Sequence, residues 1–279
     1  MIPVSEPQRL TKPQFDRFRD FIYRASGIRV DASKITLVSN RIRRRLRAGD
    51  HADFDSYYEH LTSSGCAGEL EQFLDAITTN ETHFFRTAGH FEWFKTDFVT
   101  EAITRHRQNE RAPSLRIWSA ACSTGEEPYS LAICLAENGL RLRDWKLSIL
   151  GTDISEAVLK DARAGLYGQR SLEEVSDVQL RRYFERQKDQ EVWQVRSALR
   201  EMVEFRRHNL MEPLRLPSFD CIFIRNVLIY FDRESKKAVI RNLIGALARG
   251  GYLVVGPSEG VYDMLEPLVK KSAFLYRKT

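Results

Sequence analysis

Between residues 8 and 80, apolar side chains recur at helical spacing and are separated by polar and charged positions. Phe15, Phe18, Ile22 and Tyr23 form one such set. A second set consists of Ile35, Val38, Ile42 and Leu46. This spacing places apolar side chains on one face of an amphipathic helix. The pattern predicts four helices, which contain Phe15–Tyr23, Ile35–Leu46, Asp53–Leu61 and Glu69–Ile77.

From about Ser114 the pattern changes to short apolar runs that alternate with helical segments. The runs predict strands at Leu115–Ser119, Leu147–Gly151, Val203–Arg207, Phe219–Ile224 and Tyr252–Val255. Between them, helices are predicted at Glu126–Glu137, at Glu156–Ala164, between Asp177 and Arg186, and at Arg233–Ala248. Such alternation is typical of a parallel sheet covered by helices on both faces.

The stretch EVWQVRSALREMV, between Gln190 and Val203, predicts a β-hairpin inserted before a strand of the sheet. The organisation expected from these patterns is an all-α N-terminal domain over residues 1–80 and an α/β domain over residues 81–279. The small β insert is expected near residues 188–202.

Composition identifies a globular chain. It has 279 residues, of which 43% are hydrophobic and 29% charged, as in ordinary folded domains. No apolar run approaches the roughly 20 residues that span a bilayer, and the N-terminal segment shows no apolar core of a signal peptide. The scattered histidines predict no metal site. The cysteines, none in a CxxC pair, indicate reduced thiols in a cytosolic protein: Cys66, Cys122, Cys134 and Cys221.

The formal net charge of +5 and the pI near 9.0 suit an acidic partner. Positive charge is concentrated in one predicted helix, where Ile42 and Leu46 can be buried while the arginines face outward. A solvated helix face, a nucleic-acid contact and a docking face for an acidic protein helix all fit this pattern. The segment, RIRRRLR, contains Arg41, Arg43, Arg44, Arg45 and Arg47.

The segment IWSAACSTGEEPYS (residues 117–130) predicts a strand, a loop of small side chains and the start of a helix. Small residues allow the backbone to approach a ligand closely. The next predicted strand ends in ILGTDIS, which places Asp153 at the carboxyl edge of the sheet. A carboxylate at this position is placed to bind the ribose hydroxyls of a nucleotide. Asp153 would otherwise serve as a helix N-cap beside Ser155.

Glu126 and Glu127 open the helix that follows the small-residue loop. Carboxylates stabilise the positive end of a helix dipole, so capping is one interpretation. They would repel a pyrophosphate but suit an ammonium or sulfonium group. The pattern therefore favours S-adenosylmethionine over NAD or ATP, whose phosphates need hydrogen-bond donors at this position.

Two further segments place polar residues after buried strands. FDCIFIRNVLIYFD (residues 219–232) carries Arg225, Asn226 and Tyr230 beyond its strand. Asn209 and Leu210 follow another strand and are candidates to flank an adenine. Residues in such positions belong to the ligand-binding edge of a parallel sheet, although loop and cap chemistry would also account for Arg225 and Asn226.

Taken together, these segments resemble the chemoreceptor glutamate methyltransferases, the CheR family. The resemblance covers about residues 10–278 and implies a helical N-terminal domain and a Rossmann-like class I methyltransferase domain. It implies transfer of a methyl group from S-adenosylmethionine, with S-adenosylhomocysteine as product, to glutamates on chemoreceptor signalling helices. The motifs, in the family's order, are TTNETHFFR (78–86), SAACSTGEEPYS (119–130), GTDIS (151–155), RNVLIYFD (225–232) and GPSE (256–259).

The resemblance also implies roles for individual residues. Arg86 and Tyr230 are expected beside the transferred methyl group, and the arginine-rich helix is expected to be the receptor-docking face. The cytoplasmic signalling domain of a methyl-accepting chemoreceptor is the expected partner, with no nucleic acid, no membrane insertion and a monomeric enzyme. The cofactor contacts that it implies are Asn80, Thr82, Arg86, Glu126, Asp153, Asn209, Leu210, Arg225 and Asn226.

One region departs from the family's pattern. Some members grip a receptor's C-terminal pentapeptide with a glycine-containing turn in a small β-subdomain. The corresponding stretch here, Arg186–Val195, is short and has no glycine, which predicts an enzyme that does not need the pentapeptide. The sequence also fits an enzyme that serves a chemosensory array controlling something other than motility. Two other interpretations of the whole chain are a nucleic-acid methyltransferase and a non-catalytic regulator that binds S-adenosylmethionine.

Overall fold

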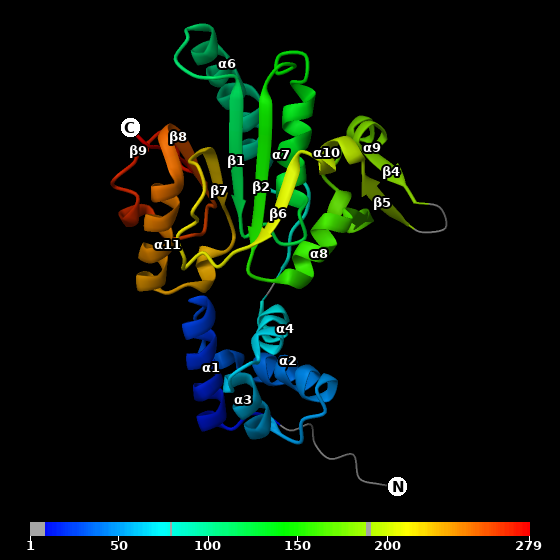
Figure 1. The fold of residues 1–279 in the computed structure, drawn as a ribbon, viewed down its shortest axis with the longest axis vertical. Helices are drawn as coiled ribbons and strands as arrows, with labels where there is room; N and C mark the ends of the chain where they lie inside the picture. The colour runs from blue at the N-terminus through cyan, green and yellow to red at the C-terminus, as the bar shows by residue number, and fades with distance from the viewer. Residues whose placement is uncertain (1–8, 79, 188–190) are drawn as a thin grey trace.

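The computed structural model of this chain describes residues 9–78, 80–187 and 191–279. It has two domains, a helical one at the N-terminal end and a larger α/β one (Figure 1). No helix among these residues is long and apolar enough to cross a membrane.

The N-terminal domain packs its helices around one apolar core, which includes Phe18, Ile22, Ile42 and Phe73. Its first helix begins with a capping box at Thr11, whose side chain and that of Gln14 satisfy each other's backbone amides. The helices are α1 (Lys12–Ser26), the 3-10 helix η1 (Ala32–Lys34), α2 (Ile35–Ala48), α3 (Phe54–Thr62) and α4 (Ala67–Ile77).

The α/β domain is built on a seven-stranded sheet with the order β6-β2-β1-β7-β8-β10-β9. The pairs among the first five of these strands are parallel, and β10 is antiparallel to both neighbours. The strands are β1 (Ser114–Ala120), β2 (Lys146–Asp153), β6 (Val203–Arg207), β7 (Phe219–Ile224), β8 (Leu247–Val255), β9 (Val269–Lys270) and β10 (Leu275–Arg277).

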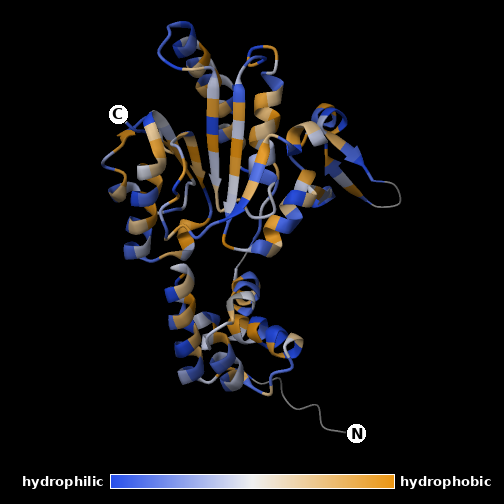
Figure 2. Cartoon of the chain, viewed as in Figure 1, coloured by the Kyte–Doolittle hydropathy of each residue, from blue (hydrophilic) through white to orange (hydrophobic). Residues whose placement is uncertain are grey.

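Helices cover both faces of this sheet (Figure 1), and its strands carry orange apolar positions among white and blue ones (Figure 2). In β7, Cys221 and Phe223 belong to the core on one face, while Ile222 and Ile224 belong to the core on the other. This alternation is the period-two pattern of a strand buried on both sides. The helical elements are α5 (Ala88–Trp93), the π-helix η2 (Phe94–Phe98), α6 (Val99–Arg107), α7 (Glu126–Glu137), α8 (Glu156–Ala164), η3 (Gln169–Leu172), α9 (Asp177–Tyr183), η4 (Leu228–Tyr230), α11 (Arg233–Ala246) and η5 (Tyr262–Met264).

A second, three-stranded sheet is antiparallel and has the order β3-β5-β4, from β3 (Leu166–Gly168), β4 (Phe184–Arg186) and β5 (Val192–Val195). The predicted small antiparallel β insert is confirmed, but its position in the chain differs from the prediction: between Gln190 and Val203 the described residues hold one strand, β5, followed by the short helix α10 (Ser197–Arg200). The partners of β5 lie earlier in the chain, so the insert begins at Leu166 rather than near residue 188. Pairing of Phe184 with Val195 buries both side chains. Residues 188–190 lie outside the described residues.

The helical domain sits against the carboxyl ends of the parallel strands (Figure 1). An isolated β-bridge joins Ile28 to Phe231, and the Arg29 amide donates to the Tyr230 carbonyl at 2.8 Å. The Asn209 side chain donates to the carbonyl of Ala25 at 3.0 Å. The edge of the sheet where polar residues gather is therefore closed by a second domain.

Candidate functional site

A cavity lies where the helical domain meets the carboxyl edge of the sheet. The loops after β1, β2, β6 and β7 form one wall, and residues of α1, η1, α2 and the segment after α4 form the other. Nine residues predicted from the sequence as cofactor-binding or catalytic line it: Asn80, Thr82, Arg86, Asp153, Asn209, Leu210, Arg225, Asn226 and Tyr230.

The loop between β1 and α7 supplies small side chains to this cavity. Ala121, Cys122 and Ser123 line it. Ala121 and Ser123 have positive φ values of 61° and 51°, and Gly125 has 94°. Left-handed backbone at non-glycine residues is uncommon and concentrates at functional sites. The short side chains expose the loop's backbone to whatever occupies the cavity.

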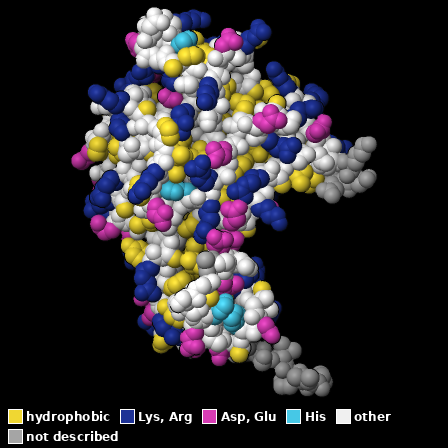
Figure 3. Space-filling view, in the orientation of Figure 1, with side chains coloured by type: hydrophobic (Ala, Val, Ile, Leu, Met, Phe, Trp, Pro, Cys, Tyr) yellow, Lys and Arg dark blue, Asp and Glu magenta, His cyan; other side chains and the backbone are white. Residues whose placement is uncertain are grey.

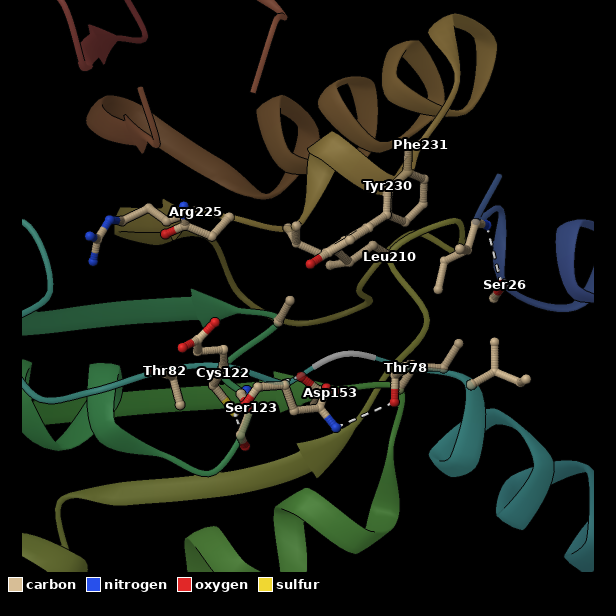
Figure 4. Close-up of a pocket in the computed structure, with 18 of the residues that line it drawn as sticks. Ser26, Thr78, Thr82, Cys122, Ser123, Asp153, Leu210, Arg225, Tyr230 and Phe231 are labelled. Atoms are coloured by element: carbon tan, nitrogen blue, oxygen red, sulfur yellow. Dashed lines mark hydrogen bonds between the residues drawn. The ribbon is translucent and has the colours of Figure 1, made fainter. Parts of the chain in front are cut away.

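Asp153 ends β2 and is buried at the floor of the cavity (Figure 4). Its carboxylate accepts hydrogen bonds from the amides of Ser123 at 2.9 Å and Ser155 at 3.0 Å. Burial raises the pKa of this carboxyl. A carboxylate has about four acceptor positions, so acceptor capacity remains for a ligand hydroxyl. Helix α8 is capped by Ser155, whose hydroxyl accepts from the Val158 amide, so the predicted alternative role of Asp153 as this N-cap is filled by its neighbour.

The two glutamates that open α7 face different surroundings. Glu126 is buried outside the cavity lining and accepts hydrogen bonds from the hydroxyls of Thr124 and Ser171. Glu127 lines the cavity instead. The structure does not place Glu126 among the residues that line the cavity, so the predicted contact of its side chain with the cofactor finds no support in this geometry.

Glu127 belongs to a buried polar network at the edge of the cavity. Its carboxylate accepts a hydrogen bond from the Ser119 hydroxyl at 2.7 Å and pairs with the Arg225 guanidinium at 2.9 Å. The Arg225 side chain is 2% exposed, packs over the Phe91 ring and also donates to the carbonyl of Arg86. The network ties the loop after β7 to α7 and to the segment that carries Arg86.

The loop after β7 presents Arg225, Asn226 and Tyr230 to the cavity. Asn226 has a positive φ of 58°. The Tyr230 ring projects into the cavity opposite Asp153 and Ser123 (Figure 4), and the Lys34 ammonium lies 5.9 Å from its centroid. The Arg225 side chain points away from this ring, so its contribution to the cavity is mainly its backbone.

The segment after α4 brings three predicted residues to the same cavity. The Asn80 carbonyl accepts from the Ser123 hydroxyl at 3.2 Å, which fastens this segment to the small-residue loop. Thr82 and Arg86 are half-buried. The Arg86 guanidinium donates to the Glu81 carbonyl at 2.9 Å and has no carboxylate partner among the described residues' ion pairs.

Residues after β6 complete the cavity. Leu210 is buried, and Asn209 is held by its bond to Ala25 in the helical domain. The side-chain oxygen of Asn209 also accepts from the Met211 amide at 3.1 Å. This places an apolar side chain and a fixed amide beside each other at the cavity wall.

The arginines of α2 divide into different settings. Arg44 and Arg47 are exposed, and Arg43 is half-buried. Arg41 lines the cavity and donates to the Ile77 carbonyl. The Arg45 guanidinium forms a bidentate ion pair with the Glu69 carboxylate, with N–O distances of 3.0 and 2.8 Å. The prediction that Arg45 belongs to a docking face does not fit, because its guanidinium is committed to packing α2 on α4.

The residues that line the cavity without having been predicted as site residues include two cationic side chains. Arg29 and Lys34 are exposed at the helical wall of the cavity. They lie outside the arginine-rich segment, and no local motif marks them. Only the docking of α1 and η1 on the loop after β7 brings them there. Of the two glutamates that open α7, the family resemblance implies Glu126 as the cofactor contact, whereas Glu127 lines the cavity.

The residues present fit S-adenosylmethionine. The acidic Asp153 suits ribose hydroxyls, and Leu210 and Val227 offer apolar surface for a base. Near the loop of small side chains, the Glu127 carboxylate lines the cavity and is already paired with Arg225. No group of three or more His, Cys, Asp or Glu side chains that could hold a metal ion occurs among the described residues.

Comparison with known families and proteins agrees with this geometry. Residues 13–78 match the all-alpha domain of CheR methyltransferases, and residues 80–273 match their SAM-binding domain. The chemotaxis protein methyltransferase of Salmonella typhimurium is 36% identical over 99% of this chain and 93% of its own length. The Escherichia coli protein of that name is 36% identical over 93% and 88%. Chemotaxis protein methyltransferase 2 of Vibrio cholerae is 34% identical over 90% and 87%. This chain therefore belongs to the CheR family of S-adenosylmethionine-dependent methyltransferases.

Proposed function

We propose that this enzyme methylates glutamate side chains on the cytoplasmic signalling helices of chemoreceptors, forming γ-methyl esters. The observation that carries the proposal is the composition of the cavity's two walls. The sheet edge provides the acidic and apolar groups suited to the cofactor. The helical domain provides Arg29, Lys34 and Arg41, which suit an anionic acceptor.

Methyl transfer to a glutamate carboxylate requires positioning of the reactants and does not require proton transfer. A glutamate carboxylate has a reference pKa of about 4.3, so it is already the nucleophilic anion at neutral pH. S-adenosylmethionine supplies an electrophilic methyl group when bound. The enzyme's residues then have to align the carboxylate oxygen with that methyl group and exclude water. Such alignment contributes roughly 7–11 kcal/mol in favourable cases.

Arg86 is the proposed orienting group for the incoming carboxylate. It lines the cavity, and its guanidinium is held on one side by the Glu81 carbonyl, which leaves other N–H groups for a ligand. A very tight ion pair would stabilise the ground state as much as the transition state. A half-buried, solvent-accessible arginine therefore suits the task better than a fully buried one.

Tyr230 is the second proposed catalytic residue. Its ring projects into the cavity between the two walls (Figure 4), and its hydroxyl can donate a hydrogen bond near the methyl group or the sulfur. The Arg29 amide holds the Tyr230 backbone. The helical domain therefore supports the position of this side chain.

Docking is proposed to use the exposed arginines of α2, Arg44 and Arg47, with Arg43 beside them. Over the face shown in Figure 3, Lys and Arg side chains are interspersed with Asp and Glu on both domains. No continuous basic stripe of the kind that tracks a nucleic-acid backbone is visible on that face. A local basic helix beside the cavity instead fits an acidic helix whose glutamate enters the site.

Receptor methylation is also proposed not to need a C-terminal pentapeptide. The insert strands β4 and β5 are short, at three and four residues, and the stretch that joins them contains no glycine. Equal initial rates on a full-length receptor and on one lacking its last five residues would support this. A large loss of rate with the truncated receptor would contradict it.

The test of the acceptor uses a soluble receptor signalling fragment in two forms. One form carries its native glutamates at the candidate methylation positions, and the other carries glutamine there. Transfer of labelled methyl to the first and not to the second is expected, because an amide is not a carboxylate nucleophile. Equal labelling of both forms, or labelling of added nucleic acid instead, would contradict the proposal.

A further inference from the structure

Glu259 lies behind the loop that follows β7 and is not part of the cavity lining. It is fully buried, with 0% of its surface exposed. Glu259 belongs to the segment after β8. Because β7 and β8 are adjacent and parallel, the segments that follow these two strands lie side by side. A buried carboxylate is costly unless every acceptor position finds a donor, so its partners show what it does.

Both carboxylate oxygens of Glu259 accept hydrogen bonds from the backbone of one short loop. One oxygen accepts from the Asn226 amide, and the other accepts from the Leu228 amide at 2.7 Å. These amides flank Val227, which lines the cavity. The carboxylate thus spans the loop and fixes two of its peptide units from the side opposite the ligand.

The backbone of the loop has an uncommon conformation. Asn226 has a positive φ of 58°, in the left-handed region that asparagine adopts more readily than most other non-glycine residues. Uncommon backbone conformations cluster at functional sites, where the surrounding structure holds them. The amide of Asn226 itself is one of the two that Glu259 binds.

Glu259 is in turn held in place by its own surroundings. The Lys236 ammonium donates to the Glu259 carbonyl at 2.6 Å. Gly256 leaves room for the carboxylate, because a Cβ at that position would lie 2.5 Å from Glu259 Oε1. The glycine and the glutamate of the GPSE segment therefore form one unit. Burial raises the pKa of this carboxyl, and the bonds from the Asn226 and Leu228 amides oppose that rise.

We propose that Glu259 is a positioning residue that holds the 225–230 loop in its ligand-binding shape and so sets Asn226 and Tyr230 in the cavity. This inference rests on the proposed role of that loop in binding the cofactor and the methyl group. It does not depend on which protein or nucleic acid accepts the methyl.

The test compares Glu259→Gln with Glu101→Gln. The first variant keeps the size of the side chain and one acceptor oxygen, but turns an N–H₂ group toward a backbone amide. The second removes a half-buried carboxylate, which accepts from Tyr252 and Arg277 at 2.6 Å each, beside Gly250 at the opposite end of the sheet. Both variants remove one carboxylate that accepts two hydrogen bonds, and only the first lies next to the cavity loop.

Two readouts are measured well below the melting temperature of every variant. Calorimetry gives the affinity for S-adenosylhomocysteine, which requires no acceptor. Amide hydrogen exchange gives the protection of the 225–231 peptide. We expect Glu259→Gln to weaken the affinity about tenfold, since a lost bond to a charged group is worth about that much, and to speed exchange in this peptide. Glu101→Gln is expected to leave both unchanged even where it lowers the melting temperature.

Glu259→Ala removes both acceptors and is expected to have the larger effect. If it fails to fold, the glutamine variant still decides the matter. An affinity of Glu259→Gln within about twofold of the parent, with the loop's exchange unchanged, would overturn the inference. An equal loss of affinity in Glu101→Gln would also overturn it. Weakened binding together with no receptor labelling by the parent enzyme would leave this inference standing and refute the proposed acceptor.

Discussion

At the scale of single residues, the buried pair of Arg225 and Glu127 contributes to both the site and the stability. The two side chains are 2% and 13% exposed, and their charged atoms are 2.9 Å apart. Glu127→Gln leaves a buried guanidinium without its countercharge. Loss of one partner of a buried pair typically costs about 3–5 kcal/mol, and we expect a decrease of this size in the free energy of unfolding, measured with urea.

Asp263→Asn is the matched control for that prediction. Asp263 pairs with Arg233, and the two side chains are 49% and 67% exposed. An exposed pair contributes less than about 1 kcal/mol. If both variants lose the same small amount, the buried pair does not carry the stability assigned to it.

His90 makes stability depend on pH. It is buried against Phe274, with ring centroids 4.2 Å apart, and its Nδ1 has no hydrogen-bond partner among the described residues. Burial and then the charge of Arg225 lower the pKa of His90 from 6.5 to about 4. Between these values the unfolded chain binds a proton that the folded chain does not. The free energy of unfolding should therefore fall on acidification, by up to about 1.4 kcal/mol per pH unit from this residue.

His90→Leu tests this contribution. Carboxylates and His208 titrate in the parent and the variant alike, so the difference between their pH profiles isolates His90. We expect the profile of the variant to be flatter between pH 4 and 6.5, as measured by urea denaturation at several pH values. Identical slopes would show that the pKa of His90 is the same in the folded and the unfolded chain, which would contradict the prediction.

Residues that directly follow a predicted parallel strand could be placed at the site from the sequence, because the end of the strand determines their position. Asp153 and Asn226 follow buried apolar strands, and parallel strands bring their carboxyl ends to one edge. The resemblance implies Glu126 rather than Glu127, but which of the two lines the cavity depends on the rotation of α7 against the sheet, which the local sequence does not determine. The commitment of Arg45 to Glu69 depends on a partner 24 positions away, which no local pattern reveals.

At the scale of elements, the loop between β1 and α7 depends on Gly125. Its φ is 94°, and a Cβ there would lie 2.9 Å from the Ala162 Cβ. Gly125→Ala should lower the free energy of unfolding by at least about 1–2 kcal/mol from the left-handed backbone alone, and weaken binding of S-adenosylhomocysteine by displacing Ser123. Thermal melting with and without this ligand measures both effects.

Gly245→Ala provides the opposite control. Gly245 lies in α11, and a Cβ there would meet no atom within 4 Å. Alanine in a helix is more favourable than glycine by about 0.5–1 kcal/mol, so this variant should be slightly stabilised and bind the ligand normally. Equal melting temperatures for the two variants would contradict the assigned backbone requirement.

Long elements with a clear period were predictable, whereas short ones depended on distant partners. The four N-terminal helices and the five parallel strands follow from the spacing of their apolar residues. The strands β9 and β10 have two and three residues, too few to show any alternation. The error in the insert has the same cause, because β5 pairs with strands on its N-terminal side and not with the segment that follows it.

At the scale of the whole molecule, we propose that the helical domain docks the acceptor and that the sheet domain binds the cofactor. Charge reversal at both Arg44 and Arg47 should raise KM for the receptor fragment and leave the affinity for S-adenosylhomocysteine unchanged. The KM of the parent should rise with salt, since exposed charges are screened within about 8 Å at physiological ionic strength. Arg249→Glu, exposed at the far end of the sheet, should leave this KM unchanged. A KM that is insensitive to salt and to both changes would reject α2 as the docking face.

The central claim concerns the bond that this enzyme forms. Labelled methyl from S-adenosylmethionine should be transferred to receptor-containing membranes, and mild alkali should then release it as volatile methanol, because a γ-methyl ester is alkali-labile. Label on a receptor-sized protein that is released in this way is the predicted result. Label that resists alkali, on protein or on nucleic acid, would contradict the account.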